Sequence, residues 1–103
     1  MTERRDFTIR WTLGSAGDFE KILDYIEKDR PLAALKFGER LLHHIEQLAK
    51  FPLSCPRSQS QPSVHESVFE SHVIYYAVGK NEIVIKAVVH GARQFLAKWL
   101  RRR

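Results

Sequence analysis

An imidazole and a guanidinium follow the end of the most apolar stretch of this chain. His90 comes directly after two valines, and a glycine and an alanine separate it from Arg93. A histidine has an unperturbed pKa of about 6.5 and transfers protons near neutrality, and an arginine can clamp a phosphate through two hydrogen bonds. A buried strand needs neither side chain for packing. The ending therefore indicates a functional site at the rim of a sheet, with a capping role for His90 or Arg93 as the alternative.

RNA cleavage is the chemistry that such residues could perform. The reaction must deprotonate a 2′-hydroxyl, meet the charge that grows on the phosphate, and protonate the leaving 5′-oxygen. If the chain cleaves RNA, we expect His90 to be the general acid or base and Arg57 and Arg93 to clamp the phosphate. Further candidates for the same cluster are His65, His72, Tyr76 and Lys86. The structural alternatives are a hydrogen bond from His90 to a backbone carbonyl and a surface ion pair from Arg93 to Glu20 or Asp24.

The first half of the chain predicts a strand followed by two helices. Residues 7–13 alternate between apolar and polar side chains, which is the period of a strand with one buried face. Ser15 and Asp18 have the spacing of a capping box, so we expect a helix over 16–28. Pro31 ends that helix and can open the next one, whose apolar stripe runs to about residue 51. The short connection requires the two helices to pack as an antiparallel hairpin.

The second half predicts three strands and a short helix. Residues 52–63 have the composition of a loop, and strands are expected over 64–69, 72–78 and 82–89, with a turn at 79–81. The strand over 72–78 is apolar on both faces, as a central strand is. Phe95, Leu96, Trp99 and Leu100 then predict an amphipathic helix, whose apolar side either lies on the sheet or waits for a partner. The expected fold is α+β, a β-α-α-β-β-β order with a C-terminal helix and a mainly antiparallel sheet on a helical hairpin.

Length and composition set the class of protein. The 103 residues suit a single domain over 1–103, with 44% hydrophobic residues. Cys55 is the only cysteine, which is typical of a reducing compartment, so we expect a cytoplasmic protein. No signal peptide or stretch of 18 apolar residues occurs, so no membrane association is expected. His43 and His44 are adjacent and point about 100° apart on a helix, so neither a metal nor a cofactor is expected.

The net charge of +5 lies entirely in the second half. Residues 1–50 hold nine basic and nine acidic side chains, and residues 51–103 hold eight and three. A local basic surface suits a polyanion or an acidic protein partner. The alternative is that the three C-terminal arginines form only a solvated tail.

The order and spacing of these features resemble the RelE/ParE superfamily of toxins from bacterial type II toxin-antitoxin systems, over residues 7–93. The resemblance is carried by Phe51 and Pro52 with Arg57 shortly after, by Tyr75 and Tyr76, by the turn Gly79, Lys80, Asn81, and by the ending His90, Gly91, Ala92, Arg93. It implies a small sheet braced by a helical hairpin, growth inhibition, a role in plasmid stabilisation, and neutralisation by a cognate antitoxin, with a hetero-oligomer as the inactive form.

Two activities occur in the superfamily that this chain resembles. RelE-like members cut messenger RNA on the ribosome, and ParE-like members inhibit DNA gyrase without hydrolysing nucleic acid. RNA-cutting members carry several lysines and arginines in the loop and second strand, where this chain has mainly serines and glutamines and then Glu66 and Glu70, which would repel a phosphate. The ending from His90 to Arg93 is also closer to the ParE-like form. The sequence therefore favours a gyrase inhibitor that is not an enzyme, with a RelE-like endoribonuclease as the alternative.

The partner surface is expected at the C-terminal end. Trp99 and Phe95 would offer apolar contacts to an antitoxin segment, and Arg101, Arg102 and Arg103 would pair with its acidic side chains. The exposed positions of the helical hairpin mix both signs of charge, so they form either a solvated face or a surface that grips the topoisomerase. An inactive interaction module with a basic second half is the remaining alternative.

Overall fold

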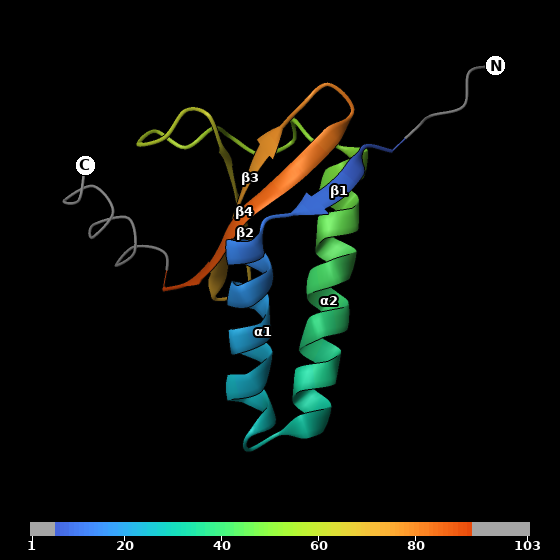
Figure 1. Ribbon diagram of the computed structural model, residues 1–103, viewed down its shortest axis with the longest axis vertical. Helices are drawn as coiled ribbons and strands as arrows, with labels where there is room; N and C mark the ends of the chain where they lie inside the picture. The colour runs from blue at the N-terminus through green and yellow to red at the C-terminus, as the bar shows by residue number, and fades with distance from the viewer. Residues whose placement is uncertain (1–5, 92–103) are drawn as a thin grey trace.

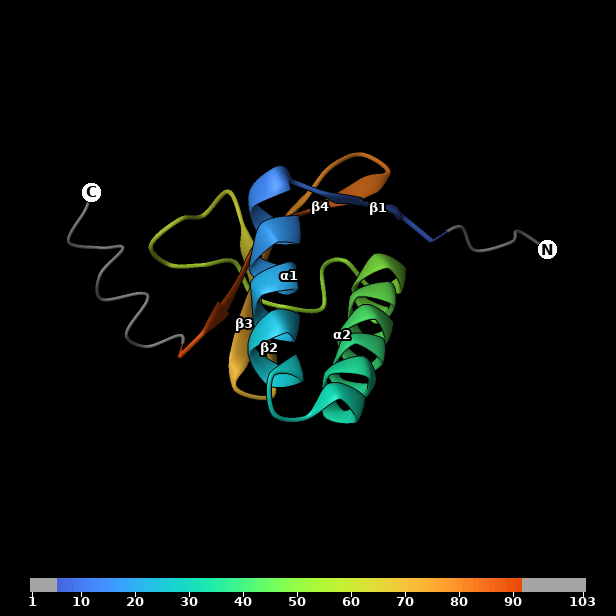
Figure 2. The same ribbon diagram turned by 60° about the horizontal axis from the view of Figure 1, so that its bottom comes forward.

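The protein folds as a helical hairpin on one side of a four-stranded sheet (Figure 1). The computed structural model describes residues 6–91 of the 103. The elements in chain order are β1 (Thr8–Trp11), α1 (Leu13–Glu27), α2 (Pro31–Lys50), β2 (His65–Phe69), β3 (His72–Val78) and β4 (Glu82–His90). This is the expected α+β fold, and both helices cover the same face of the sheet (Figure 2). The C-terminal helix expected over residues 95–100 lies outside the described residues.

The sheet has the strand order β1-β4-β3-β2. β2 pairs with β3 and β3 with β4 in antiparallel fashion, whereas β1 lies parallel to β4. The sheet is therefore mixed, and the expectation of a mainly antiparallel sheet is confirmed. β3 and β4 are the two inner strands, as the double-faced apolar pattern of residues 72–78 predicted.

The start of α1 differs from the capping box expected at Ser15 and Asp18. The cap is Thr12, whose Oγ1 accepts a hydrogen bond from the backbone N–H of Ser15 at 3.0 Å. Ser15 lies inside the helix, fully buried, and its hydroxyl donates to the carbonyl of Thr12. The Asp18 carboxylate is used elsewhere, because it accepts the backbone N–H of Val88. The expectation was wrong because a tertiary partner, and not the local helix terminus, holds Asp18.

α2 begins with Pro31 at its first turn, as expected, and packs against α1 through a close approach at Gly38. A Cβ at that position would lie 3.4 Å from a methyl carbon of Leu23 and 3.7 Å from the ring of Phe19. Phe19 stacks on Trp11 with 5.4 Å between the ring centroids, so α1 is also fixed to β1. Ring packing thus fixes α1 to the sheet, and a small residue lets the two helices pack against each other.

Two apolar clusters lie on opposite faces of the sheet. The larger one joins α2 to the helix-facing side of β3 and β4, and Tyr76 is wholly buried in it. The smaller one contains Val64, Val73 and Tyr75 on the other face. The adjacent tyrosines therefore point to opposite faces, as alternation requires, and both are buried. Burial is the main cause that raises the pKa of Tyr75 to about 12, and it raises the pKa of Tyr76 further still.

Candidate functional site

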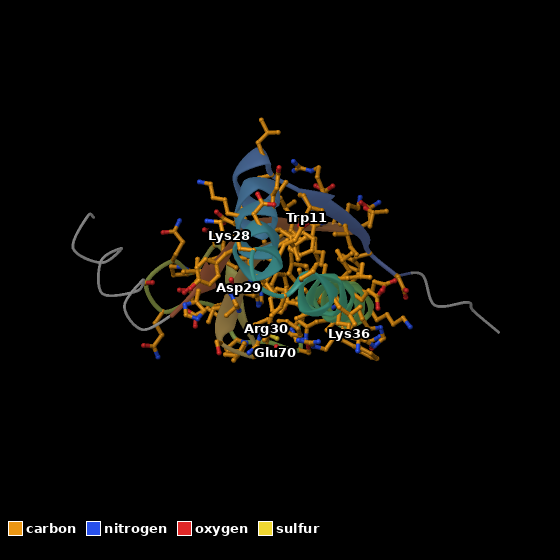
Figure 3. The ribbon with its side chains drawn as sticks, turned by 90° about the horizontal axis from the view of Figure 1, so that it is seen from below. Trp11, Lys28, Asp29, Arg30, Lys36 and Glu70 are labelled. Atoms are coloured by element: carbon orange, nitrogen blue, oxygen red, sulfur yellow. The ribbon has the colours of Figure 1, made fainter. Side chains whose placement is uncertain are left out.

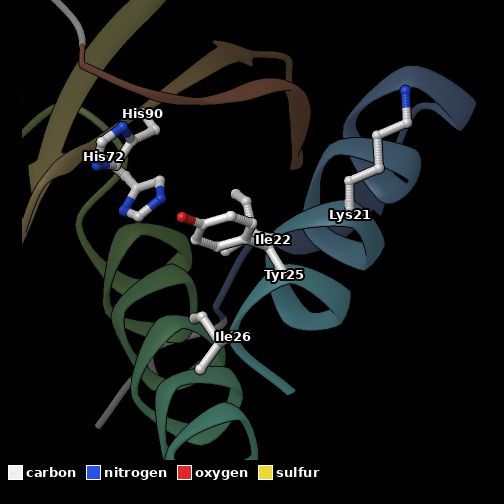
Figure 4. A pocket seen from close by; sticks show the side chains of 6 residues that line it. All are labelled: Lys21, Ile22, Tyr25, Ile26, His72 and His90. Atoms are coloured by element: carbon white, nitrogen blue, oxygen red, sulfur yellow. The ribbon is translucent and has the colours of Figure 1, made fainter. Parts of the chain in front are cut away.

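A cavity of about 450 Å³ opens where β3 begins and β4 ends. α1 contributes Lys21, Ile22, Tyr25 and Ile26, and the sheet contributes His72 and His90. Figure 4 shows the phenol of Tyr25 directed toward the two imidazoles, with Lys21 on the far side of the same helix face. The cavity therefore combines an apolar wall from α1 with two imidazoles. One of them belongs to His90, the proton-transfer residue expected from the sequence.

His72 and His90 are direct partners across the antiparallel strands β3 and β4. Their ring centroids lie 4.9 Å apart with an interplanar angle of 65°. His72 is only 8% exposed, since Phe37 of α2 covers its other side at 5.3 Å, whereas His90 is exposed. The Nδ1 of His72 is buried without a hydrogen-bond partner. A buried polar atom without a partner is costly and uncommon, so it points to a function.

The electrostatic surroundings keep His72 neutral at pH 7. Burial lowers its pKa most, the neighbouring His90 lowers it further, and Glu70 raises it to a smaller extent. Glu70 is itself bound by Arg40, whose Nε and Nη2 donate to its carboxylate at 2.8 and 3.1 Å. A neutral imidazole can accept a proton or donate an electron pair to a metal.

Two contacts add to the pairing with β3 at the end of β4, where β1 no longer covers the strand. β1 pairs with β4 only from Glu82 to Ile85. The pairing of β4 with β3 then shifts its register, at Tyr75 and Tyr76 of β3. Beyond that point the Val88 N–H donates to Asp18 Oδ2 of α1 at 3.1 Å. Gly91 adopts a φ of +66°, which a glycine tolerates without strain, and its N–H donates to the carbonyl of Ser71. His90 therefore stands on a fixed strand end.

The structure does not bring Arg57 beside His90. Arg57 forms an isolated bridge to His65, which pairs with Tyr76 at one end of β3, whereas His90 pairs with His72 at the other end. Tyr76 and His72 are four positions apart, which is about 13 Å along the strand. The exposed guanidinium of Arg57 donates instead to the Pro62 carbonyl at 3.3 Å. The expected phosphate clamp around His90 therefore lacks Arg57.

Two further candidates for the catalytic cluster are used in packing. His65 is 6% exposed, hydrogen-bonds the Cys55 carbonyl through Nδ1 at 2.8 Å, and stacks on Tyr76. The Tyr76 hydroxyl donates to the Pro52 carbonyl at 2.9 Å. Both groups hold the loop that precedes β2 against the sheet. Lys86 is exposed on β4.

Several expected site residues cannot be placed. Arg93 and the expected partner-binding residues Phe95, Trp99, Arg101, Arg102 and Arg103 lie outside the described residues, and their roles stay predictions. In turn, sequence reasoning missed the α1 wall of the cavity. The spacing of Ile22 and Ile26, one helical turn apart, is a signal for an apolar helix face, but it does not tell which strand ends that face lies against.

The chain matches the family described as ParE toxin of type II toxin-antitoxin system, parDE, over residues 9–95. It is also 33% identical over 89 residues to a protein named "Putative toxin Y4kP" from Sinorhizobium fredii (strain NBRC 101917 / NGR234), covering 84% of this chain and 91% of that protein. A solved structure titled "Chromosomal ParDE TA system from P. aeruginosa" shares the fold with a TM-score of 0.72 and 22% identity, over 82% of this chain and 95% of that one.

The fold and these likenesses define a toxin of a type II toxin-antitoxin system. The chain belongs to the ParE toxin family. Membership implies an antitoxin partner. Within residues 6–91, no helix is long and apolar enough to cross a membrane, and no three or more His, Cys, Asp or Glu side chains are grouped as metal ligands.

Proposed function

We propose that this ParE-family chain inhibits DNA gyrase by binding to it, without cutting nucleic acid, and that a cognate antitoxin neutralises it. The observation that carries the proposal is the separation of Arg57 from His90 at opposite ends of β3. Ribonuclease chemistry needs its cations and its proton-transfer groups around one phosphate. Binding needs only a stable surface, which the described residues offer.

The outer side of the helical hairpin is the surface that we propose for gyrase. Leu32, Leu35 and Leu42 of α2 are 62%, 60% and 45% exposed, and they follow one another at helical spacing. Charged side chains of both signs surround the connection between the helices, among them Lys28, Asp29 and Arg30, as Figure 3 shows from below. Apolar anchors inside a polar rim are typical of protein interfaces.

A supercoiling assay tests the proposal. Purified full-length chain is added to gyrase, relaxed plasmid and ATP, and we expect loss of supercoiling as the chain is titrated in. Unchanged supercoiling at a large molar excess of folded chain would exclude gyrase as the target.

Variants of the hairpin locate the surface. The double substitution Leu35→Asp and Leu42→Asp should weaken inhibition at least tenfold, because two buried contacts of about 1.5 to 3 kcal/mol each are lost. Val68→Asp is the matched control, since Val68 is 72% exposed on the edge strand β2. Equal inhibition by both variants would show that the proposed gyrase contact does not lie on α2.

The antitoxin is tested separately. The chain, produced with the product of the neighbouring reading frame, should elute from gel filtration as a hetero-oligomer, and the complex should leave gyrase active. Elution of the chain alone, with inhibition undiminished, would exclude that product as the antitoxin.

The exposed His90 next to the neutral His72 favours a second candidate, a RelE-like ribosome-dependent endoribonuclease. Message ends mapped after induction would show ribosome-dependent cuts that vanish in His90→Ala. Normal growth on induction of the chain alone would contradict both toxic activities and support an inactive interaction module with a basic second half.

A further inference from the structure

We propose that His72 and His90 together bind one transition-metal ion of the Zn²⁺, Ni²⁺ or Cu²⁺ type at the end of β3 and β4. Nothing in the gyrase or ribonuclease activities requires such a site. The proposal rests on the paired imidazoles, on the unpartnered ring nitrogen of His72 and on the cavity above them.

The distance between the rings matches two ligands of one ion. Zinc binds imidazole nitrogen at about 2.0 to 2.1 Å, which places the ring centroid about 3.2 Å from the ion. Two centroids 4.9 Å apart then subtend about 100° at that ion, close to the tetrahedral angle. Directly opposite residues on antiparallel strands have Cβ atoms about 4.5 to 5.5 Å apart, so the backbone register itself supplies this spacing.

The contacts of His72 leave one of its ring nitrogens for a ligand, because its Nδ1 has no hydrogen-bond partner among the described residues. Phe37 packs against the ring of His72, with 5.3 Å between the ring centroids, and limits its movement. Glu70 adds a negative charge near His72, although Arg40 shares it.

The cavity leaves room for the other ligands. Its volume of about 450 Å³ holds several water molecules, and the Tyr25 phenol points toward the imidazoles. With only two imidazoles from the described residues, the site is weaker than a structural zinc site, which has four protein ligands. We therefore expect a Kd in the micromolar range and an open coordination position.

Binding would join the first residue of β3 to the last residue of β4. That strand end is otherwise held by its pairing with β3, by the hydrogen bond from Val88 to Asp18 and by the Gly91 contact to Ser71. A metal ion there would add a cross-link between the two strand ends. Metal supply would thus act on the conformation of His90 without any change in sequence.

Calorimetric titration of the full chain without a histidine tag, using ZnCl₂ at pH 7.5, tests the site. We expect saturable binding of one ion per chain, and a rise in Tm of at least about 5 °C at saturating metal. His90→Ala should weaken binding at least tenfold while leaving the metal-free Tm almost unchanged, because His90 is exposed. His43→Ala, which removes an exposed histidine from α2, is the matched control and should bind as the wild type does.

Three outcomes would overturn the proposal: no saturable binding by the wild type, unchanged binding by His90→Ala, or loss of binding by His43→Ala. His72→Asn provides a second check at the buried ligand, and circular dichroism verifies that it folds. The folded variant should lose binding as well, and retained affinity would count against the site. Binding should also weaken below about pH 6.5, where protons compete for imidazole. All readouts are independent of toxicity.

Discussion

Two buried histidines lie toward opposite ends of β3 in contrasting settings: His65 of β2, which pairs with Tyr76, and His72 of β3 itself. At one end, His65 bonds the Cys55 carbonyl and stacks on Tyr76, whose hydroxyl bonds the Pro52 carbonyl. At the other end, His72 is equally buried, but its Nδ1 has no partner, and its ring lies against that of His90 beside a cavity that both residues line. The residues at the first end hold a loop in place, whereas the second end has a ring nitrogen without a hydrogen-bond partner.

The comparison teaches that burial alone does not tell a structural histidine from a functional one. The exposed fractions of His65 and His72 are 6% and 8%, so they differ hardly at all. What differs is the Nδ1 atom, which has a hydrogen-bond partner in His65 and none in His72. Substitutions at the closed end, beside His65, should therefore lower stability. Substitutions at the open end, beside His72, should leave stability nearly unchanged and impair function.

The largest effect is expected from Tyr76→Ala at the closed end. Removing this fully buried ring should lower the free energy of unfolding by about 3 to 5 kcal/mol. Tyr25→Ala, at the 78% exposed tyrosine of the open end, should change it by less than about 0.5 kcal/mol. Urea denaturation of both variants measures the contrast, and similar costs would remove the distinction between the ends.

The same substitution at the two histidines tests the contrast most directly. His65→Phe should cost about 1 to 3 kcal/mol, because the Cys55 carbonyl loses its partner. His72→Phe should be neutral or stabilising, because it replaces an unpaired buried polar atom with an apolar ring. Thermal unfolding followed by circular dichroism would reveal the order, and a more costly His72→Phe would contradict it.

The hydrogen bond that fixes the open end should be worth less. Asp18→Ala should lower the free energy of unfolding by about 1 to 2 kcal/mol, because the Val88 N–H loses a carboxylate acceptor. Amide hydrogen exchange at Val88 should accelerate, while exchange at Ile85, in the part of β4 paired with β1, should not. Asp18→Asn, which keeps an acceptor oxygen, is the control, and its free energy of unfolding should lie between those of the wild type and Asp18→Ala.

Acid should weaken the open end by a smaller amount. The pKa values of His72 and His44 are lowered in the folded chain, chiefly by burial, so the unfolded chain binds more protons just below pH 6.5. Stability should therefore fall as the pH drops below about 6.5, until the lowered pKa values are passed. The charged groups that act on His72 are Glu70 and His90, and Tyr25 and Lys21 line the cavity beside it. The urea midpoint of His72→Phe should depend less on pH between 7.5 and 5.5 than that of the wild type, and an equal dependence would exclude His72 as a source.

Much of the fold could be predicted because its signals are local. The double-faced apolar run placed β3 with the bounds that the structure has, and Pro31 marked the start of α2. The start of α1 could not be predicted, because Thr12 and Ser15 both have cap side chains and the choice depends on Val88, 70 residues from Asp18. Such a contact leaves no trace in the local pattern.

The candidate site was predictable only in part. His90 stood out because a strand rarely ends on an imidazole for packing reasons. Its pairing with His72 depends on the register of β3 and β4, including the shift at Tyr75 and Tyr76, which periodicity does not reveal. The same register separates Arg57 from His90, whereas Arg93 lies outside the described residues, so its grouping with His90 stays a prediction.

The parallel pairing of β1 with β4 constrains how the protein is made. β1 is the first strand to leave the ribosome, yet its register partners, such as Glu82 for Thr8, are among the last described residues to be synthesised. A chain that has not been translated through β4 cannot complete the sheet, and closure must wait for a contact of long sequence separation. The order of synthesis therefore delays the pairing of the first strand until the last described strand has been made.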